Sequence, residues 1–263
     1  MKKVLKCAEP TVLLTYRQNN PTNIWRQFRR NKARYDEVKG DLIRDQGGLC
    51  AYCEIDLKQA PQASDKDDFR VEHFHPKSDQ TTGYNWHLDW NNLLGCCHGG
   101  SERNVIDAAS SAPNRAGRFG CGDHSCDVPK GNNNWDHIIL NPLTLPASPL
   151  IFVFQRSNGS VSIHPQNCLE AGVSQQQALQ TIDNLRLDSP RLQRLRGEVL
   201  DQINQNLQSK IQNGMTPDEA RRDIARRMLR KNSVGRWPAF FSAIRSYLGQ
   251  AAEDHLGTID YRG

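Results

Sequence analysis

Residues 69–78, FRVEHFHPKS, decide how the middle of this chain is expected to fold. The first six residues alternate between two faces, with His73 on one face and Glu72 on the other, which is the period of a β-strand. Pro76 ends the strand because proline cannot donate a ladder hydrogen bond. A histidine carried on a strand beside an acid is a suitable starting point for a general base next to a metal ligand.

Cysteines lie on both sides of this stretch. Cys50 and Cys53 form a C-x-x-C turn, the spacing at which two thiolates from one loop occupy adjacent corners of a zinc tetrahedron. The other two ligands must come from downstream, where the candidates are Cys96, Cys97, His98, Cys121, His124 and Cys126. The C-x-x-C turn follows a helical pattern and leads into a polar loop, which favours zinc over a redox dithiol.

Composition and charge narrow the class of protein. With 263 residues, of which 37% are hydrophobic, the chain can bury a sizeable core. It shows neither a secretory signal nor an apolar run of membrane-spanning length, so we expect a cytoplasmic protein without membrane contact. Residues 189–248 hold twelve Lys or Arg against five Asp or Glu, which favours a polyanionic partner, although solvated helix faces explain the same pattern.

Helical patterns flank the cysteine-rich middle. Apolar residues at helical spacing predict one helix over residues 23–46, ended by Gly47 and Gly48. Asn158-Gly159 predicts a two-residue hairpin turn, and residues 107–120 read as a flexible excursion. Further helices are expected to begin at Ser174, at Ser189-Pro190 and at a capping box from Thr216 to Glu219. These patterns divide the chain into an N-terminal helical segment (1–48), a central domain with a closing hairpin (49–165) and a C-terminal helical domain (166–263).

Read in order, the segments LIRDQGGLCAYCE, VEHFHPKS, WNNLLGCC and CDVPKGN carry a family resemblance. The chain resembles the zinc-stapled ββα-metal type of HNH endonuclease, and more narrowly the PtuB-like HNH proteins of retron and Septu anti-phage systems. The resemblance implies an α+β fold. It consists of a ββα-metal nuclease core with a structural zinc, flanked by an N-terminal helix and a C-terminal helical bundle.

The resemblance also implies roles for particular residues. His73 is the general base that activates water, and Asn92 braces the loop that holds it. Glu72 and Asp127 bind the catalytic Mg²⁺ or Mn²⁺; Asp127 departs from the histidine of the family pattern but remains a suitable oxygen ligand. Lys77 and Lys130 are expected to contact phosphate, whereas His75 is expected to be a bystander.

For zinc, the family spacing implies the ligands Cys50, Cys53, Cys97 and Cys126. Cys97 follows Asn92 at the offset where HNH proteins usually show their third cysteine. However, 28 residues separate Cys97 from Cys126, far more than in the short form of the motif. Four residues therefore stay open as substitutes: Cys96, His98, Cys121 and His124.

The implied activity is metal-dependent hydrolysis of phosphodiester bonds in nucleic acid, with DNA as the first substrate class and an RNA such as tRNA as the second. The protein would be the toxic effector of a Septu or retron anti-phage defence system. Implied partners are a PtuA-like ABC/SMC ATPase, docked on the C-terminal helices, and in retrons a reverse transcriptase with its RNA-linked DNA (msDNA). Two alternatives are a zinc-stapled adaptor that binds nucleic acid or protein without cutting, and a redox dithiol protein.

Overall fold

The computed structural model describes residues 1–57, 67–102 and 120–263. The excursion expected at residues 107–120 lies outside the described residues, apart from Gly120. In chain order the elements are α1 (Thr11–Asn19), α2 (Trp25–Phe28), α3 (Lys32–Asp45), β1 (Arg70–His73), the 3-10 helix η1 (Trp90–Asn92), β2 (Leu93–Cys96), the 3-10 helix η2 (Cys121–Asp123), α4 (Asp127–Lys130), β3 (Phe152–Phe154), β4 (Val161–Ile163), α5 (Pro165–Glu170), α6 (Gln175–Asn184), α7 (Pro190–Gln212), α8 (Pro217–Met228), α9 (Phe241–Leu248) and α10 (Gln250–Thr258).

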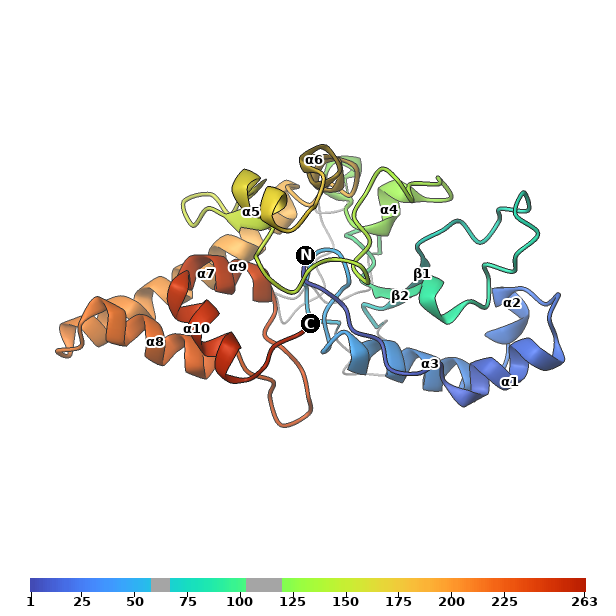
Figure 1. Ribbon diagram of the computed structural model, residues 1–263, viewed down its shortest axis with the longest axis horizontal. Helices are drawn as coiled ribbons and strands as arrows, with labels where there is room; N and C mark the ends of the chain where they lie inside the picture. Colours follow the sequence, from blue (N-terminus) through green and yellow to red (C-terminus); the bar gives the residue numbers. More distant parts are fainter. Residues whose placement is uncertain (58–66, 103–119) are drawn as a thin grey trace.

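Figure 1 shows an elongated arrangement of these elements. Helices α1 to α3 lie toward one end of the molecule, and α7, α8 and α10 lie at the other. The small sheet β1-β2 lies between them, close to the N-terminal helices. In the described ranges, no helix combines the length and the apolar character that crossing a membrane would require.

The prediction of a single N-terminal helix over residues 23–46 is wrong. Two helices, α2 and α3, occupy this range, and α1 precedes them. The break follows from local capping: the side chain of Asn31 accepts a hydrogen bond from the backbone N–H of Arg34 at 3.1 Å and starts a new helix. Gly47 and Gly48 do end α3, with φ values of +62° and +81° that favour glycine.

Strands β1 and β2 form an antiparallel pair in which Arg70 is opposite Cys96 and His73 is opposite Leu93. Gln46, directly after α3, fastens this pair to the helix. Its side-chain amide donates to the carbonyls of Leu49 and Gly95, and its side-chain oxygen accepts from the N–H of Gly95, all at 2.7 Å. The strand that carries the candidate base is thereby held in a fixed position relative to α3.

The hairpin β3-β4 forms, but the expected two-residue turn is wrong. Gln155 donates its N–H to the carbonyl of Ser160 at 3.0 Å, so the loop consists of the four residues 156–159. Contacts with α7 explain the difference. A Cβ on Gly159 would lie 1.9 Å from the Gln193 carbonyl oxygen, and Arg196 donates to the Gly159 carbonyl at 2.7 Å. Packing against the helix therefore sets the turn.

The C-terminal helices begin where the sequence predicts. Ser174 caps α6, Pro190 occupies the first turn of α7, and the capping box of Thr216 and Glu219 is confirmed at the start of α8. These helices share one buried cluster with the rest of the chain. Backbone hydrogen bonds join the two parts, such as Phe240 N–H to the Glu54 carbonyl at 2.8 Å. The C-terminal helices thus support the turn that holds Cys50 and Cys53.

Candidate functional site

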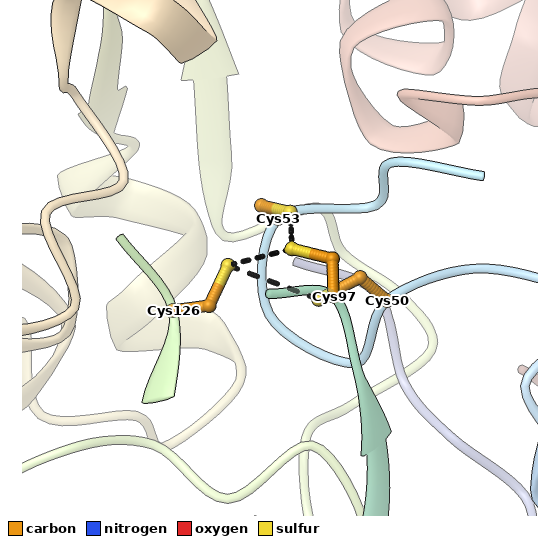
Figure 2. Close-up of side chains that lie close together, drawn as sticks. All are labelled: Cys50, Cys53, Cys97 and Cys126. Carbon is orange, nitrogen blue, oxygen red and sulfur yellow. Dashed lines mark hydrogen bonds between the residues drawn. The ribbon is translucent and has the colours of Figure 1, made fainter. Parts of the chain in front are cut away.

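Four cysteines from three separate segments converge in one buried cluster (Figure 2). The Sγ atoms of Cys50, Cys53, Cys97 and Cys126 all lie within 4.8 Å of one another. The measured pairs are Cys50–Cys126 at 3.8 Å, Cys53–Cys97 at 3.6 Å and Cys97–Cys126 at 3.6 Å. Four sulfurs bound tetrahedrally at the usual Zn–S length of about 2.3 Å would be about 3.8 Å apart. The cluster therefore fits a structural zinc ion.

Local structure presents these sulfurs to one another. Cys50 and Cys53 lie in the turn closed by Glu54 N–H donating to the Cys50 carbonyl at 3.1 Å. Cys97 directly follows β2, and its sulfur accepts from Gly99 N–H at 3.3 Å. Cys126 precedes α4 with a φ of 62°. Its N–H donates to the Leu185 carbonyl at 2.8 Å, so a C-terminal residue positions the fourth ligand.

The substitutes considered for zinc lie outside the cluster. Cys96 is buried in β2 but does not join the four sulfurs. His98 lies against Asp68, with its Nδ1 3.2 Å from the carboxylate, and His124 is half-buried elsewhere. The side chain of Cys121 is outside the described part of the chain. No further group of three or more His, Cys, Asp or Glu converges as closely in the residues that the structure describes.

Arg191 brings a positive charge to this cluster from the first turn of α7. Its side chain is buried and donates to Ser125 Oγ at 3.3 Å. Burial alone would lower the pKa of Arg191, but the negative charge of Cys97, Cys53 and Cys126 outweighs it and raises that pKa. Four thiolates around one Zn²⁺ carry a net charge of −2, which a buried guanidinium partly balances. Sequence analysis did not single out Arg191.

His73 ends β1 as a buried imidazole, 3% exposed, with one ring nitrogen bonded and the other unbonded. Nε2 lies 3.2 Å from the His87 carbonyl oxygen, which accepts only, so Nε2 carries the proton. Nδ1 is buried and has no hydrogen-bond partner among the described residues. Burial lowers the pKa of His73 to about 3, and the neighbouring charge of Lys77 acts in the same direction. The imidazole is therefore neutral near pH 7, with its Nδ1 lone pair unused.

Two buried carboxylates interact with each other, Glu72 next to His73 on β1 and Asp127 at the start of α4. Lys130 Nζ is 2.8 Å from Glu72 Oε1, and Arg70 Nε is 2.8 Å from Asp127 Oδ2. Apart from these ion pairs, Glu72 Oε1 and both Asp127 oxygens have no hydrogen-bond partner within the described ranges. Burial raises the pKa of both carboxyls, and the charge of Glu72 raises that of Asp127 further. Such under-satisfied oxygens suit a divalent cation.

The lysines expected at phosphate differ in position. Lys77 is half-buried, and burial lowers its pKa. Lys130 is fully buried, pairs with Glu72 and donates to the His73 carbonyl at 3.1 Å. The ammonium of Lys130 therefore faces the interior, held by Glu72 and the His73 carbonyl, which does not match the contact with phosphate expected for it.

Asn92 and His75 fix the loop between β1 and β2. The Asn92 amide accepts from His75 N–H at 2.6 Å and donates to the carbonyls of His75 at 3.0 Å and Trp86 at 2.9 Å. The His75 ring lies between two carboxylates, Asp136 at 2.6 Å and Asp79 at 2.9 Å. Nothing in the sequence indicates these contacts, so a bystander is expected at His75. Asp136 lies 61 positions further along the chain and meets His75 only after folding.

Comparison with known proteins identifies a relative of this chain. No protein-family model matches the chain. A curated Escherichia coli protein described as "Retron Ec83 putative HNH endonuclease" is 33% identical over 218 residues, which cover 78% of this chain and 81% of that protein.

Proposed function

Because the chain belongs to the family of this retron HNH endonuclease, we propose that it is a metal-dependent endonuclease that hydrolyses phosphodiester bonds in nucleic acid. The observation that carries the proposal is the neutral His73 imidazole, with an unbonded Nδ1, on the same strand as the under-satisfied carboxylate of Glu72. β1, β2 and α4 would be the ββα-metal unit, stapled by zinc.

His73 would act as the general base. Its Nδ1 accepts a proton from the attacking water while the His87 carbonyl holds the proton on Nε2 and fixes the orientation of the ring. Asn92 would act indirectly. It bonds the backbone two residues after His73 and so positions the loop that supplies the His87 carbonyl.

Glu72 and Asp127 would hold Mg²⁺ or Mn²⁺. Their carboxylates are buried and short of hydrogen bonds within the described residues, which fits hard cation ligands. A cation bound there neutralises charge on the phosphoryl oxygens and the leaving group. Lys77, which is half-buried and whose charge acts on Glu72, would contact the phosphate backbone.

Zinc would serve folding in this enzyme. The central unit has two four-residue strands and a four-residue helix, which are too short to hold their positions by apolar burial alone. A structural metal that joins the turn at Cys50, the end of β2 and the start of α4 supplies the missing stability.

The retron relative supports a retron setting for this enzyme. We propose that it is the toxic effector of a retron or Septu system, and that the C-terminal helices dock on a PtuA-like ABC/SMC ATPase. A retron reverse transcriptase with its msDNA would be a further partner. DNA is the first substrate class and RNA the second.

A cleavage assay tests the function. Wild type and His73→Ala are incubated with plasmid DNA, single-stranded DNA and tRNA, in Mg²⁺, Mn²⁺ or a chelator, with and without the ATPase. We expect metal-dependent cleavage by wild type alone. Equal absence of cleavage by both proteins, with every partner present, would leave the alternative of a zinc-stapled adaptor. Recovery of a metal-free protein whose Cys50 and Cys53 cycle with thioredoxin would favour the redox dithiol instead.

A further inference from the structure

The short helix α2 and the two residues that follow it carry an exposed group of arginines, called here the α2 arginines. Arg26, Arg29 and Arg30 are all exposed, and none has a carboxylate partner in the described part of the chain. Other exposed arginines form ion pairs, namely Arg44 with Asp41, Arg221 with Asp218 and Arg262 with Asp260. The charge of the α2 arginines is therefore not compensated within the described structure, which leaves it available to an anionic partner.

The position of α2 connects this charge to the candidate base. Trp25, the first residue of α2, contacts the His73 ring edge-on, with the ring centroids 5.5 Å apart at 78°. Trp25 also stacks on Phe28 at 5.1 Å, so both apolar residues of the helix face inward and its arginines face solvent. Arg26 lies in α2, and Arg29 and Arg30 follow the helix directly, so three exposed arginines lie within five consecutive residues.

The excess of basic residues in 189–248 is a weaker candidate for a surface that binds an anionic partner near His73. In α8, Arg226 and Arg227 lie against Asp223, and Arg221 pairs with Asp218. Figure 1 shows α8 at the opposite end of the molecule from α2, away from β1. Its charge is thus partly compensated and distant from the proposed chemistry.

We propose that Arg26, Arg29 and Arg30 form a phosphate-binding surface that holds the backbone of nucleic acid beside His73. This inference rests on the proposed function and deepens it by identifying the side of the protein from which nucleic acid would reach His73. Guanidinium groups pair with phosphate oxygens in two-point contacts and carry no base information, so the surface binds without sequence preference. Specificity would come from elsewhere in the complex.

The test uses the full chain in a His73→Ala background, which prevents cutting. The triple substitution Arg26→Gln, Arg29→Gln and Arg30→Gln is compared with a matched loss of three exposed arginines on and beside α8, Arg222→Gln, Arg226→Gln and Arg230→Gln. Probes are a fluorescein-labelled duplex and its single strand, titrated at several salt concentrations. We expect the α2 variant to bind about tenfold more weakly and to show a log–log salt slope smaller by about 3. The α8 variant should bind like its parent.

Three results would overturn the inference. These are binding by the α2 variant within twofold of its parent, an equal loss of binding in both triple variants, and a parent that binds neither probe. Cleavage assays with His73 restored distinguish failure of the proposed phosphate-binding surface from failure of the proposed nuclease function. If the α2 variant cuts as wild type does while His73→Ala does not cut, the nuclease stands and the surface does not.

Discussion

The side chain of Asn92 bonds both backbone polar groups of His75, accepting from its N–H at 2.6 Å and donating to its carbonyl at 3.0 Å. Asn92 is the last residue of the 3-10 helix before β2, and His75 lies two residues after His73, the last residue of β1. The Asn92 amide therefore closes the loop that connects the two strands. The amide also donates to the Trp86 carbonyl, next to the His87 carbonyl that bonds His73. The loop and the orientation of the His73 ring therefore depend on one buried side chain.

Replacing this brace should affect stability and cleavage together. Asn92→Ala removes three hydrogen bonds, and each buried backbone group left without a partner costs about 1–3 kcal/mol. We expect a lower free energy of unfolding by urea titration and weaker cleavage. Asn91→Ala is the matched control, because Asn91 is adjacent but exposed. Equal stability in the two variants would contradict the brace.

Zinc content should depend on Cys97 but not on Cys96. Cys97→Ser removes one of the four clustered sulfurs, so we expect zinc below one equivalent per chain and a lower melting temperature. Cys96→Ser changes a neighbouring buried thiol outside the cluster and should keep its zinc. Metal analysis by mass spectrometry, with thermal melts, distinguishes them. Full zinc in Cys97→Ser would refute the ligand assignment.

Asp127→Asn should separate the two metal sites. The amide keeps the size of the side chain but removes a buried negative charge that repels Glu72. We expect loss of cleavage and of Mn²⁺ binding by calorimetry, with zinc retained. Loss of zinc instead would mean that Asp127 serves the cysteine cluster rather than the cation.

Lys6 should make stability depend on pH. Its ammonium lies 4.0 Å from the centroid of the Trp90 ring and donates to the carbonyls of Trp90 and Leu93. Burial lowers the pKa of Lys6 to about 7 from an ordinary 10.5. Between these values the unfolded state binds more protons than the folded state, so the free energy of unfolding rises with pH, by at most about 1.4 kcal/mol per pH unit.

The substitution Lys6→Met removes this titration. We expect urea titrations between pH 7 and pH 9 to show a smaller rise in stability for Lys6→Met than for wild type. Lys32→Met is the control, because the Lys32 side chain is 86% exposed and should leave the rise unchanged. A parallel rise in wild type and Lys6→Met would mean that another group is responsible.

Much of the local structure could be read from the sequence because local chemistry determines it. The capping box at Thr216 requires only Glu219 three residues later, and α3 ends where two glycines adopt positive φ. The strand period places Glu72 and His73 on β1. The helix break at Asn31 was also local, but helical spacing on both sides concealed it.

The sequence by itself determined the donors available for zinc, the strand that carries His73 and the family to which its motifs point. The tertiary structure decided which donors meet: it brings Cys126, whose N–H bonds the Leu185 carbonyl, next to Cys97. It also turned Lys130 inward onto Glu72, set Asp136 against His75 and brought Trp25 to His73. These contacts join residues far apart in the chain. They depend on packing, whereas caps, turns and strand periods depend on neighbours along the backbone.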